Sequence, residues 1–350
     1  MLQAPRRTRS LAALASLLLT LGLVTACGSG KAASPAATGS AGGAFPVTIA
    51  HKFGATTIKA EPKRIVTVGL TDQDAVLALG KVPVGTTEWF GGFSGAIGPW
   101  AKDRLHGAPL PTVLKDTGTG PQVEKIAALR PDLILAVYGG LTKKQYQTLS
   151  KFAPVVAQPK QYNDFGVPWE VQTKTIGQAL GKVGEADKLV SGVEQRFTQI
   201  RDDNPEFKGK TAVTATPYEG YFVYGSQDPR SRNLASLGFT LPADLDKLIG
   251  DKFGASISKE RTDLLDQQVV VWSVSNVAKD APKLHADKLY ADLNVVKQGR
   301  EIAVGEDTPY GIAYSFVTVL SLPYLLDRLV PQLKAAVDGD PATKVEQPAN

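Results

Sequence analysis

The feature that most constrains the fold is one long amphipathic helix pattern between two runs of alternating strands and helices. Apolar residues recur at helical spacing from Glu185 to Asp202, over about five turns at 3.6 residues per turn, and Asn204-Pro205 ends the pattern. On both sides, short β-branched runs alternate with helical segments, which is typical of parallel α/β units. The sequence therefore predicts an α/β protein in the order lobe, long helix, lobe.

The other predicted elements fall into two groups, one on each side of that helix. Before it, strands are expected at 65–68, 82–86, 133–137 and 155–157, and helices at 72–79, 123–129 and 143–152. After it, strands are expected at 211–216, 221–224, 269–272 and 301–304, and helices at 231–237 and 316–330. The last helix contains Pro323, which should kink it or begin a new turn because proline has no N–H to donate.

The chain begins with a predicted secretory leader. Three arginines precede an apolar stretch of about 16 residues, which ends in Val24-Thr25-Ala26-Cys27. This order is typical of a lipoprotein signal peptide at residues 1–26 with lipidation of Cys27, and the stretch is shorter than the ~20 residues of a spanning helix. We therefore expect an extracytoplasmic protein anchored to the cell membrane by lipid. The alternative is an ordinary signal peptide with a chance cysteine.

The remaining boundaries follow from composition. Residues 27–44 are small and polar and cannot bury enough surface to fold, so a flexible tether is expected there. The body is divided into an N-terminal lobe at 45–168, an interlobe helical region at 169–205 and a C-terminal lobe at 206–335, followed by a disordered tail at 336–350. Removing the three leader arginines lowers the formal charge from +5 to +2, which argues against a nucleic-acid partner.

Motifs for catalysis and metal binding are missing from the sequence. The three histidines lie far apart and lack the spacing of a zinc site, and no GxSxG, P-loop or GxGxxG motif occurs in its required context. Carboxylates such as Asp72, Asp74 and Glu306 fall where helix caps and solvated side chains are commoner than catalytic groups. We therefore expect no catalytic residue, no metal ligands and no cofactor, with an exported hydrolase using these carboxylates as the alternative.

Aromatic and arginine side chains gather in predicted loops, several of them just after strands. In open α/β sheets ligands bind outside the carboxyl ends of the strands, and small-molecule sites combine aromatic walls with a few polar groups. Ordinary core filling is the alternative for each residue, and it is an equal alternative for Trp272, which lies in a strand. The predicted ligand-binding residues are Trp89, Tyr138, Tyr162, Trp169, Tyr218, Tyr224, Arg230, Arg232, Trp272 and Tyr310.

Several phrases resemble the iron-siderophore and cobalamin substrate-binding family (class III) of ABC importers. They are RIVTVGLTDQDAVLALGKVPVGTTEW, VEKIAALRPDLILA and SKERTDLLDQQVVVW, and the resemblance runs from about residue 45 to 330. Three shorter phrases, YGGLT at 138–142, PWEVQT at 168–173 and DPRSR at 228–232, resemble the ferric-siderophore branch of actinobacterial-like lipoproteins.

The resemblance implies a helical-backbone periplasmic-binding-protein fold, in which two Rossmann-like lobes are joined by a single long rigid helix. It also implies a monomer that captures a ferric siderophore and delivers it to an ABC permease dimer with its ATPase. By motif match, Glu124 and Glu260 would dock on the permease. A hydroxamate chelate is preferred because few cations cluster in the loops. Haem and cobalamin are alternatives within the same fold, and an adhesive surface protein is a further alternative.

Overall fold

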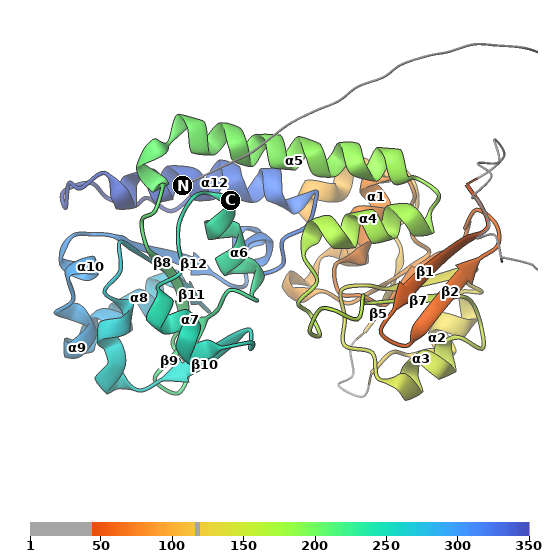
Figure 1. Cartoon of the computed structure of the whole chain (residues 1–350), viewed down its shortest axis with the longest axis horizontal. Coiled ribbons are helices and arrows are strands. Elements are labelled where there is room, and N and C mark those ends of the chain that lie inside the picture. Colours follow the sequence, from red (N-terminus) through yellow and green to blue (C-terminus); the bar gives the residue numbers. More distant parts are fainter. Residues whose placement is uncertain (1–43, 116–119, 350) are drawn as a thin grey trace, which may run out of the picture. The chain divides into compact units, whose positions relative to one another are not determined.

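The computed structural model describes residues 44–115 and 120–349 (Figure 1). Cys27, the predicted signal peptide and all but the last residue of the predicted tether lie outside this part of the chain. In the described residues, no helix combines the length and the apolar composition that crossing a membrane requires.

The N-terminal lobe is built on a five-stranded parallel sheet in the order β5-β4-β3-β6-β7. Its strands are β3 (Ile65–Thr67), β4 (Gly85–Thr87), β5 (Thr112–Leu114), β6 (Leu133–Ala136) and β7 (Val155–Ala157). Its helices are α1 (Asp72–Ala78), α2 (Val123–Ala128), α3 (Lys143–Leu149) and α4 (Trp169–Ala179). An antiparallel hairpin of β1 (Val47–His51) and β2 (Gly54–Ile58) packs beside β7.

Both faces of this sheet are covered, because successive strand residues point to opposite sides. Ile65 and Leu133 pack with α1, α4 and the hairpin, whereas Val66 and Ile134 pack with α2 and α3 on the other face. Burial on both faces explains why these strands read as continuous apolar runs. Three 3₁₀ segments, Phe90–Gly92, Ser94–Ala96 and Pro99–Leu105, follow β4.

The C-terminal lobe repeats the plan with a mixed sheet in the order β10-β9-β8-β11-β12. The parallel strands are β8 (Ala212–Thr216), β11 (Val269–Val274) and β12 (Glu301–Gly305), and the antiparallel edge is β9 (Tyr221–Tyr224) with β10 (Gly254–Ile257). One face is covered by α6 (Pro229–Ser236), α11 (Pro309–Ser315) and α12 (Ser321–Val337). The other is covered by α7 (Ala243–Ile249), α8 (Val277–Ala286), α9 (Lys288–Ala291) and α10 (Asn294–Lys297).

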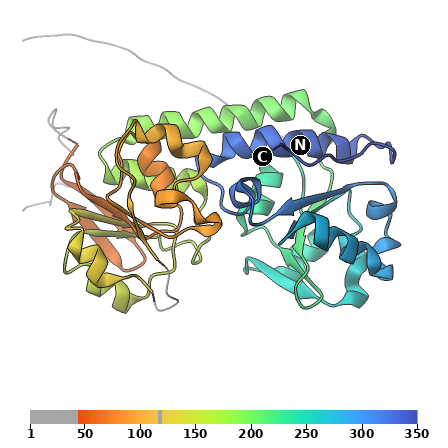
Figure 2. The same ribbon diagram turned by 180° about the vertical axis from the view of Figure 1, so that it is seen from behind.

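The predicted long helix is α5 (Val183–Asp203), and it contributes to the cores of both lobes (Figure 1). Ala186, near its start, belongs to the N-terminal core, and Val193 and Phe197 belong to the C-terminal core. Leu189 packs against both. Seen from the other side, α5 runs alongside α12 (Figure 2), to which it is joined by an ion pair between Arg196 and Asp327. One unbroken helix is therefore shared between the two lobes.

Two predictions near the C-terminus differ from the structure. The helix predicted at 316–330 begins at Ser321 and runs on to Val337 as α12. Pro323 lies in the first turn of α12, where a missing N–H breaks no helical bond. The tail expected to be disordered is partly packed: Val345 contacts the C-terminal core, and Gln332 Nε2 on α12 donates to the Glu346 carbonyl at 2.9 Å. The β1-β2 hairpin was not predicted, whereas α4 lies within the interlobe helical region predicted at 169–205.

Candidate ligand-binding cleft

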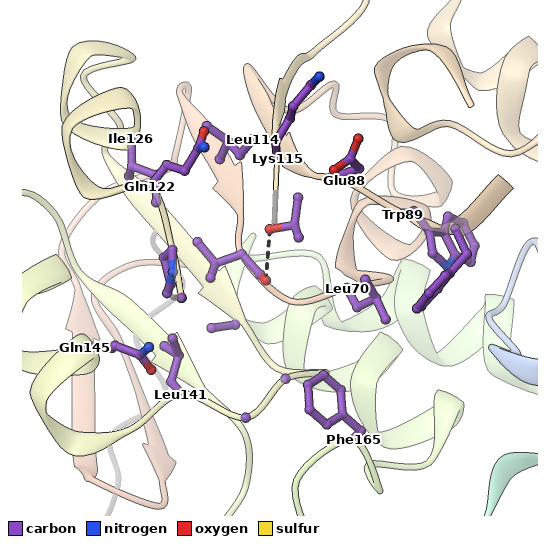
Figure 3. A pocket seen from close by; sticks show the side chains of 18 of the residues that line it. Leu70, Glu88, Trp89, Leu114, Lys115, Gln122, Ile126, Leu141, Gln145 and Phe165 are labelled. Carbon is purple, nitrogen blue, oxygen red and sulfur yellow. Dashed lines mark hydrogen bonds between the residues drawn. The ribbon is translucent and has the colours of Figure 1, made fainter. Parts of the chain in front are cut away.

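Two cavities meet where the lobes face each other. The first has a volume of about 620 Å³ and is lined mainly by the N-terminal lobe (Figure 3). The second, of about 560 Å³, is lined by Tyr138 and residues 163–166 of the N-terminal lobe and by residues 227–230 and 251–254 of the C-terminal lobe. Phe165 and Phe316 line both cavities, so the two form one cleft.

The first cavity has apolar walls that come from the carboxyl ends of neighbouring strands. The lining side chains include Val68, Leu70, Trp89, Leu114, Ile126 and Leu141 (Figure 3). Parallel strands end at one edge of a sheet, which explains why residues following β3, β4, β5 and β6 converge here. Exposed Glu88 and Lys115 supply the only charges of this cavity among the described residues.

Aromatic rings and unpartnered polar atoms add to this wall. Phe90, on the N-terminal lobe, stacks on Phe316 of the C-terminal lobe with centroids 5.3 Å apart and planes 11° apart. The buried Trp89 Nε1 and Gln122 Oε1 have no hydrogen-bond partner within the described residues. A buried polar atom without a partner is destabilising, so each of these two atoms carries an uncompensated desolvation cost close to the cavity.

The second cavity contains a buried ion pair at the start of α6. Asp228 caps the helix by accepting the Arg230 backbone N–H at 2.8 Å, and its carboxylate accepts Arg230 Nη1 at 3.0 Å. Burial alone lowers the pKa of Arg230, but the Asp228 carboxylate outweighs it, and the pKa lies above its ordinary value. The guanidinium lies 4.1 Å over the Tyr224 ring, and its buried Nε has no partner in the described structure. The guanidinium is therefore fixed at the edge of the second cavity, with the Arg230 side chain 12% exposed.

Three of the ten predicted ligand-binding residues line the cleft, and a fourth packs against one of them. Trp89 lines the first cavity, Tyr138 and Arg230 line the second, and Tyr224 supports Arg230 from below. Burial raises the pKa of Tyr138, which keeps its phenol neutral and able to donate a hydrogen bond at pH 7.

The other six predicted residues lie elsewhere. Trp169 and Arg232 line a small cavity of about 60 Å³, which shares Tyr138 and Pro229 with the second cavity. Tyr162 packs against the N-terminal core, and Tyr218 is 60% exposed in the turn between β8 and β9. None of these four lines either cavity of the cleft.

For Trp272 and Tyr310 the structure contradicts ligand contact. Trp272 is 1% exposed, and its Nε1 donates to the Tyr290 hydroxyl at 2.5 Å. Tyr310 is buried and donates to Gln332 Oε1 at 2.6 Å. Both side chains complete the core of the C-terminal lobe because β11 is covered on both faces and α11 packs under α12.

Sequence reasoning missed the phenylalanines of the cleft, which are Phe90, Phe165, Phe253 and Phe316. Phe90 and Phe253 are 60% and 59% exposed, which is unusual for so apolar a side chain. Two of these phenylalanines could have been predicted from the sequence, because Phe90 and Phe165 occur in the same loop phrases as the predicted residues Trp89 and Tyr162.

The carboxylates considered for hydrolysis are structural or lie away from the cleft. Asp72 is fully buried, and its oxygens accept the Val137 and Tyr138 backbone N–H groups at 2.7 and 3.0 Å and Gln172 Nε2 at 2.7 Å. Glu306 lines neither cavity. In residues 44–115 and 120–349, no cluster of three His, Cys, Asp or Glu side chains could hold a metal ion.

Asp74 joins the lobes. Its Oδ2 accepts Trp100 Nε1 at 2.7 Å and, from the C-terminal lobe, the Thr318 hydroxyl at 2.6 Å. Burial raises the pKa of Asp74 from 3.8 to about 6, and the buried Oδ1 has no partner in the described part of the chain. The folded state therefore favours the protonated carboxyl.

The raised pKa of Asp74 predicts a pH-dependent stability. Between pH 4 and 6 the folded state binds more protons at Asp74 than the unfolded chain, so the free energy of unfolding falls as the pH rises through this range. The whole decrease from Asp74 is about 3 kcal/mol, because each tenfold difference in proton affinity is worth about 1.4 kcal/mol. Asp74→Asn keeps an acceptor but cannot titrate, so its urea-unfolding free energy should rise relative to wild type between pH 4 and 7. Equal pH profiles for the two proteins would reject this role.

Comparison with known proteins identifies the family. Residues 65–308 match the family model of the periplasmic binding protein. A periplasmic solute-binding protein of Mycobacterium smegmatis is 36% identical, with a TM-score of 0.73 over 83% of this chain and 98% of that one. Streptococcus pneumoniae PiaA in complex with ferrichrome is 27% identical, with a TM-score of 0.73 over 84% of this chain and 99% of PiaA.

Relatives found by sequence are also named as binding proteins or substrate-binding lipoproteins, and they align with different shares of this chain. The Fe(3+) dicitrate-binding periplasmic protein FecB of Escherichia coli is 29% identical over 57% of this chain and 64% of FecB, and lipoprotein YhfQ of Bacillus subtilis aligns over only 46% of its length. The ferric-anguibactin-binding protein FatB of Vibrio anguillarum is 23% identical over 81% of this chain and 87% of FatB. With two lobes sharing one helix and a cleft between them, the chain belongs to the periplasmic binding protein family.

Proposed function

We propose that the chain is the extracytoplasmic substrate-binding component of an ABC importer and that it captures a ferric siderophore. The observation that carries the proposal is the cleft, where aromatic walls meet Arg230, whose guanidinium is held by Asp228 at the edge of the second cavity. Relatives named for ferric citrate, ferric anguibactin and ferrichrome support this ligand class.

The charge of the cleft favours a hydroxamate chelate. Among the residues that the structure describes, the two cavities are lined by three cationic side chains (Lys115, Arg230, Lys252) and four carboxylates (Glu88, Asp164, Asp228, Asp251). A ferric tris-catecholate carries three negative charges and would be repelled by this balance, whereas a ferric trihydroxamate is neutral. In this arrangement the phenylalanines pack on the carbon skeleton of the chelate, and Arg230 donates to its iron-bound oxygens.

The lobes are expected to move little when the ligand binds. The unbroken α5 joins them, and the Asp74–Thr318 hydrogen bond adds a second tie. A preformed cleft loses less conformational freedom on binding than one that must close.

Delivery to a permease is proposed to use the exposed carboxylates Glu124 and Glu260. Glu124 lies in the first turn of α2, two residues after the cavity-lining Gln122, and Glu260 lies in the 3₁₀ segment Lys259–Leu265. A hydrogen bond from Ser258 lowers the pKa of Glu260 and keeps it charged. Each carboxylate belongs to a different lobe, so together they provide a two-point contact for arginines on a permease dimer.

A fluorescence titration tests the ligand class. Ferric chelates absorb light, so binding near Trp89 should quench the emission of the four tryptophans saturably and without turnover. Ferrichrome and ferrioxamine B are expected to bind, ferric enterobactin to bind more weakly, and haem and cobalamin not to bind. Saturable binding of haem or cobalamin alone would replace the siderophore as the ligand, and hydrolysis of an ester or phosphate substrate would favour the enzyme alternative.

Membrane attachment is proposed to depend on Cys27. Lipidation supplies about 0.8 kcal/mol for each buried CH₂, and two or more acyl chains give stable anchoring. In cells, Cys27→Ala should therefore move the protein from the membrane fraction to the soluble extracytoplasmic fraction, whereas Ser29→Ala should not. Retention of the Cys27→Ala protein in the membrane fraction would contradict the lipid anchor.

A further inference from the structure

The turn at residues 163–166, here called the Phe165 loop, lies on the edge shared by the two cavities. We propose that Phe165 is a fixed wall that selects ligands by shape, and that Arg232 is the positioning residue that holds it across the two lobes. The ligand part of this proposal rests on the proposed function, whereas the positioning part rests only on contacts within the chain.

Phe165 is placed as a wall by its backbone and its neighbours. Its φ of +58° lies in the left-handed region, where bulky residues are rare and strained, so contacts around it must hold the turn. The ring is 49% exposed and lies edge-on to Tyr138, with centroids 6.0 Å apart. It borders the first cavity (Figure 3) and also lines the second. A Cβ at Gly140 would lie 3.1 Å from its Cε2, so glycine there lets the ring approach the backbone.

Three contacts from outside fix the Phe165 loop. Lys52 Nζ pairs with Asp164 Oδ1 at 2.8 Å from the N-terminal lobe. From the C-terminal lobe, the Asp251 carbonyl accepts Asn163 Nδ2 at 3.0 Å, and Arg232 Nη1 donates to the Gly166 carbonyl at 2.8 Å. Because two of the three partners belong to the opposite lobe, the position of the ring depends on the spacing of the lobes.

Arg232 is oriented for this role by its own lobe. Its Nε donates to the Ser226 carbonyl at 3.3 Å and its Nη2 to Gln227 Oε1 at 3.1 Å, which leaves Nη1 directed at Gly166. Arg230, two residues earlier, borders the second cavity instead and keeps an unpartnered Nε within the described residues. The two arginines of the DPRSR phrase therefore have different tasks: Arg230 faces the ligand, and Arg232 holds the wall.

The positioning role is tested without any ligand. Chymotrypsin cleaves after phenylalanine, so the full chain, purified in detergent, is digested and the cut after Phe165 is timed against the cut after exposed Phe152. Losing a hydrogen bond from a charged donor should open the loop about tenfold more often in Arg232→Ala. The matched control is Arg201→Ala, which loses a 2.6 Å bond to the Ser236 carbonyl elsewhere on the C-terminal lobe. Equal cleavage rates in the two variants would overturn the positioning role.

The selecting role is tested by the ratio of two dissociation constants. Phe165→Gly removes the wall without straining the backbone, because glycine adopts positive φ freely. We expect its preference for ferrioxamine B, which has a free pendant arm, over compact ferrichrome to rise about tenfold, the equivalent of 1.4 kcal/mol. Phe152→Gly, at an exposed site away from both cavities, is the control and should leave the ratio unchanged. If the ratio of the two dissociation constants in Phe165→Gly equals the wild-type ratio, or shifts in favour of ferrichrome, Phe165 does not select ligands by shape.

A double-mutant cycle separates positioning from direct contact. If Arg232 acts through Phe165, adding Arg232→Ala to Phe165→Gly should change the ratio no further, whereas additive effects would show that Arg232 contacts the ligand itself and would overturn its positioning role. A wild-type chain that binds neither chelate rejects the proposed function and the ligand-selecting role together. In that case the proteolysis result still decides whether Arg232 holds the Phe165 loop.

Discussion

Replacing Asp72 with alanine is expected to lower the free energy of unfolding by about 3 kcal/mol or more. The substitution leaves the Val137 and Tyr138 backbone N–H groups and the Gln172 amide without their acceptor in a fully buried site. These donors come from the end of β6 and from α4, so α1 loses its attachment to both. Urea unfolding followed by tryptophan fluorescence measures the change.

Asp132→Ala is the matched control for Asp72→Ala. Asp132 also accepts two backbone N–H groups, from Lys63 and Arg64, each at 2.8 Å, but it is exposed and water can replace it. Asp132→Ala should therefore lower the free energy of unfolding by only about 1 kcal/mol. If the free energy of unfolding falls equally in the two variants, the stabilising effect of Asp72 does not depend on its burial. Since Asp72 also orients the backbone of Tyr138, weaker ligand binding should accompany its replacement.

Removing both Glu124 and Glu260 is expected to abolish uptake of the ferric siderophore while leaving its dissociation constant within about twofold of wild type. Both side chains are exposed and neither lines a cavity of the cleft. Exposed charges contribute little to stability, so the double alanine variant should also unfold at the wild-type urea concentration. Uptake of iron-55 by cells is measured beside fluorescence titration of the purified protein.

The control for that variant is a second pair of exposed glutamates, Glu194 on α5 and Glu206 just after it. Glu194→Ala with Glu206→Ala changes the net charge equally and should leave uptake intact. A loss of affinity in the first pair would place Glu124 or Glu260 at the ligand. Normal uptake with both replaced would reject their docking role.

The secondary structure could be predicted best where a periodic pattern and burial agree. The helix predicted at 185–202 is α5 (Val183–Asp203), and the strand predicted at 221–224 is β9. Prediction was weaker for short elements such as β5 and α9, because a few residues carry too little periodicity to stand out from a loop. Pro323 lies in the first turn of α12, which is one of the two effects predicted for it, because a proline is tolerated where its N–H would have no helical partner.

The candidate site could be predicted only in part, and the aromatic residues show why. Trp89 and Trp272 both lie at or near strand ends, yet one borders the first cavity and the other is sealed under Tyr290. A strand covered on both faces is apolar throughout, so the sequence does not distinguish a residue facing the cleft from one facing a helix. Arg230 and Arg232 lie two positions apart on α6, and the sequence likewise does not show that only Arg230 lines the second cavity.

The sequence by itself determined the α/β class, the lobe, helix, lobe order and the family, because these depend on local periodicity and on contiguous phrases. Only the tertiary structure decided which side chains form the cleft. Phe165 and Phe316 are separated by about 150 residues of chain but border the same two cavities. Their meeting depends on how α5 sets the two sheets against each other, and no local pattern in the chain encodes that spacing.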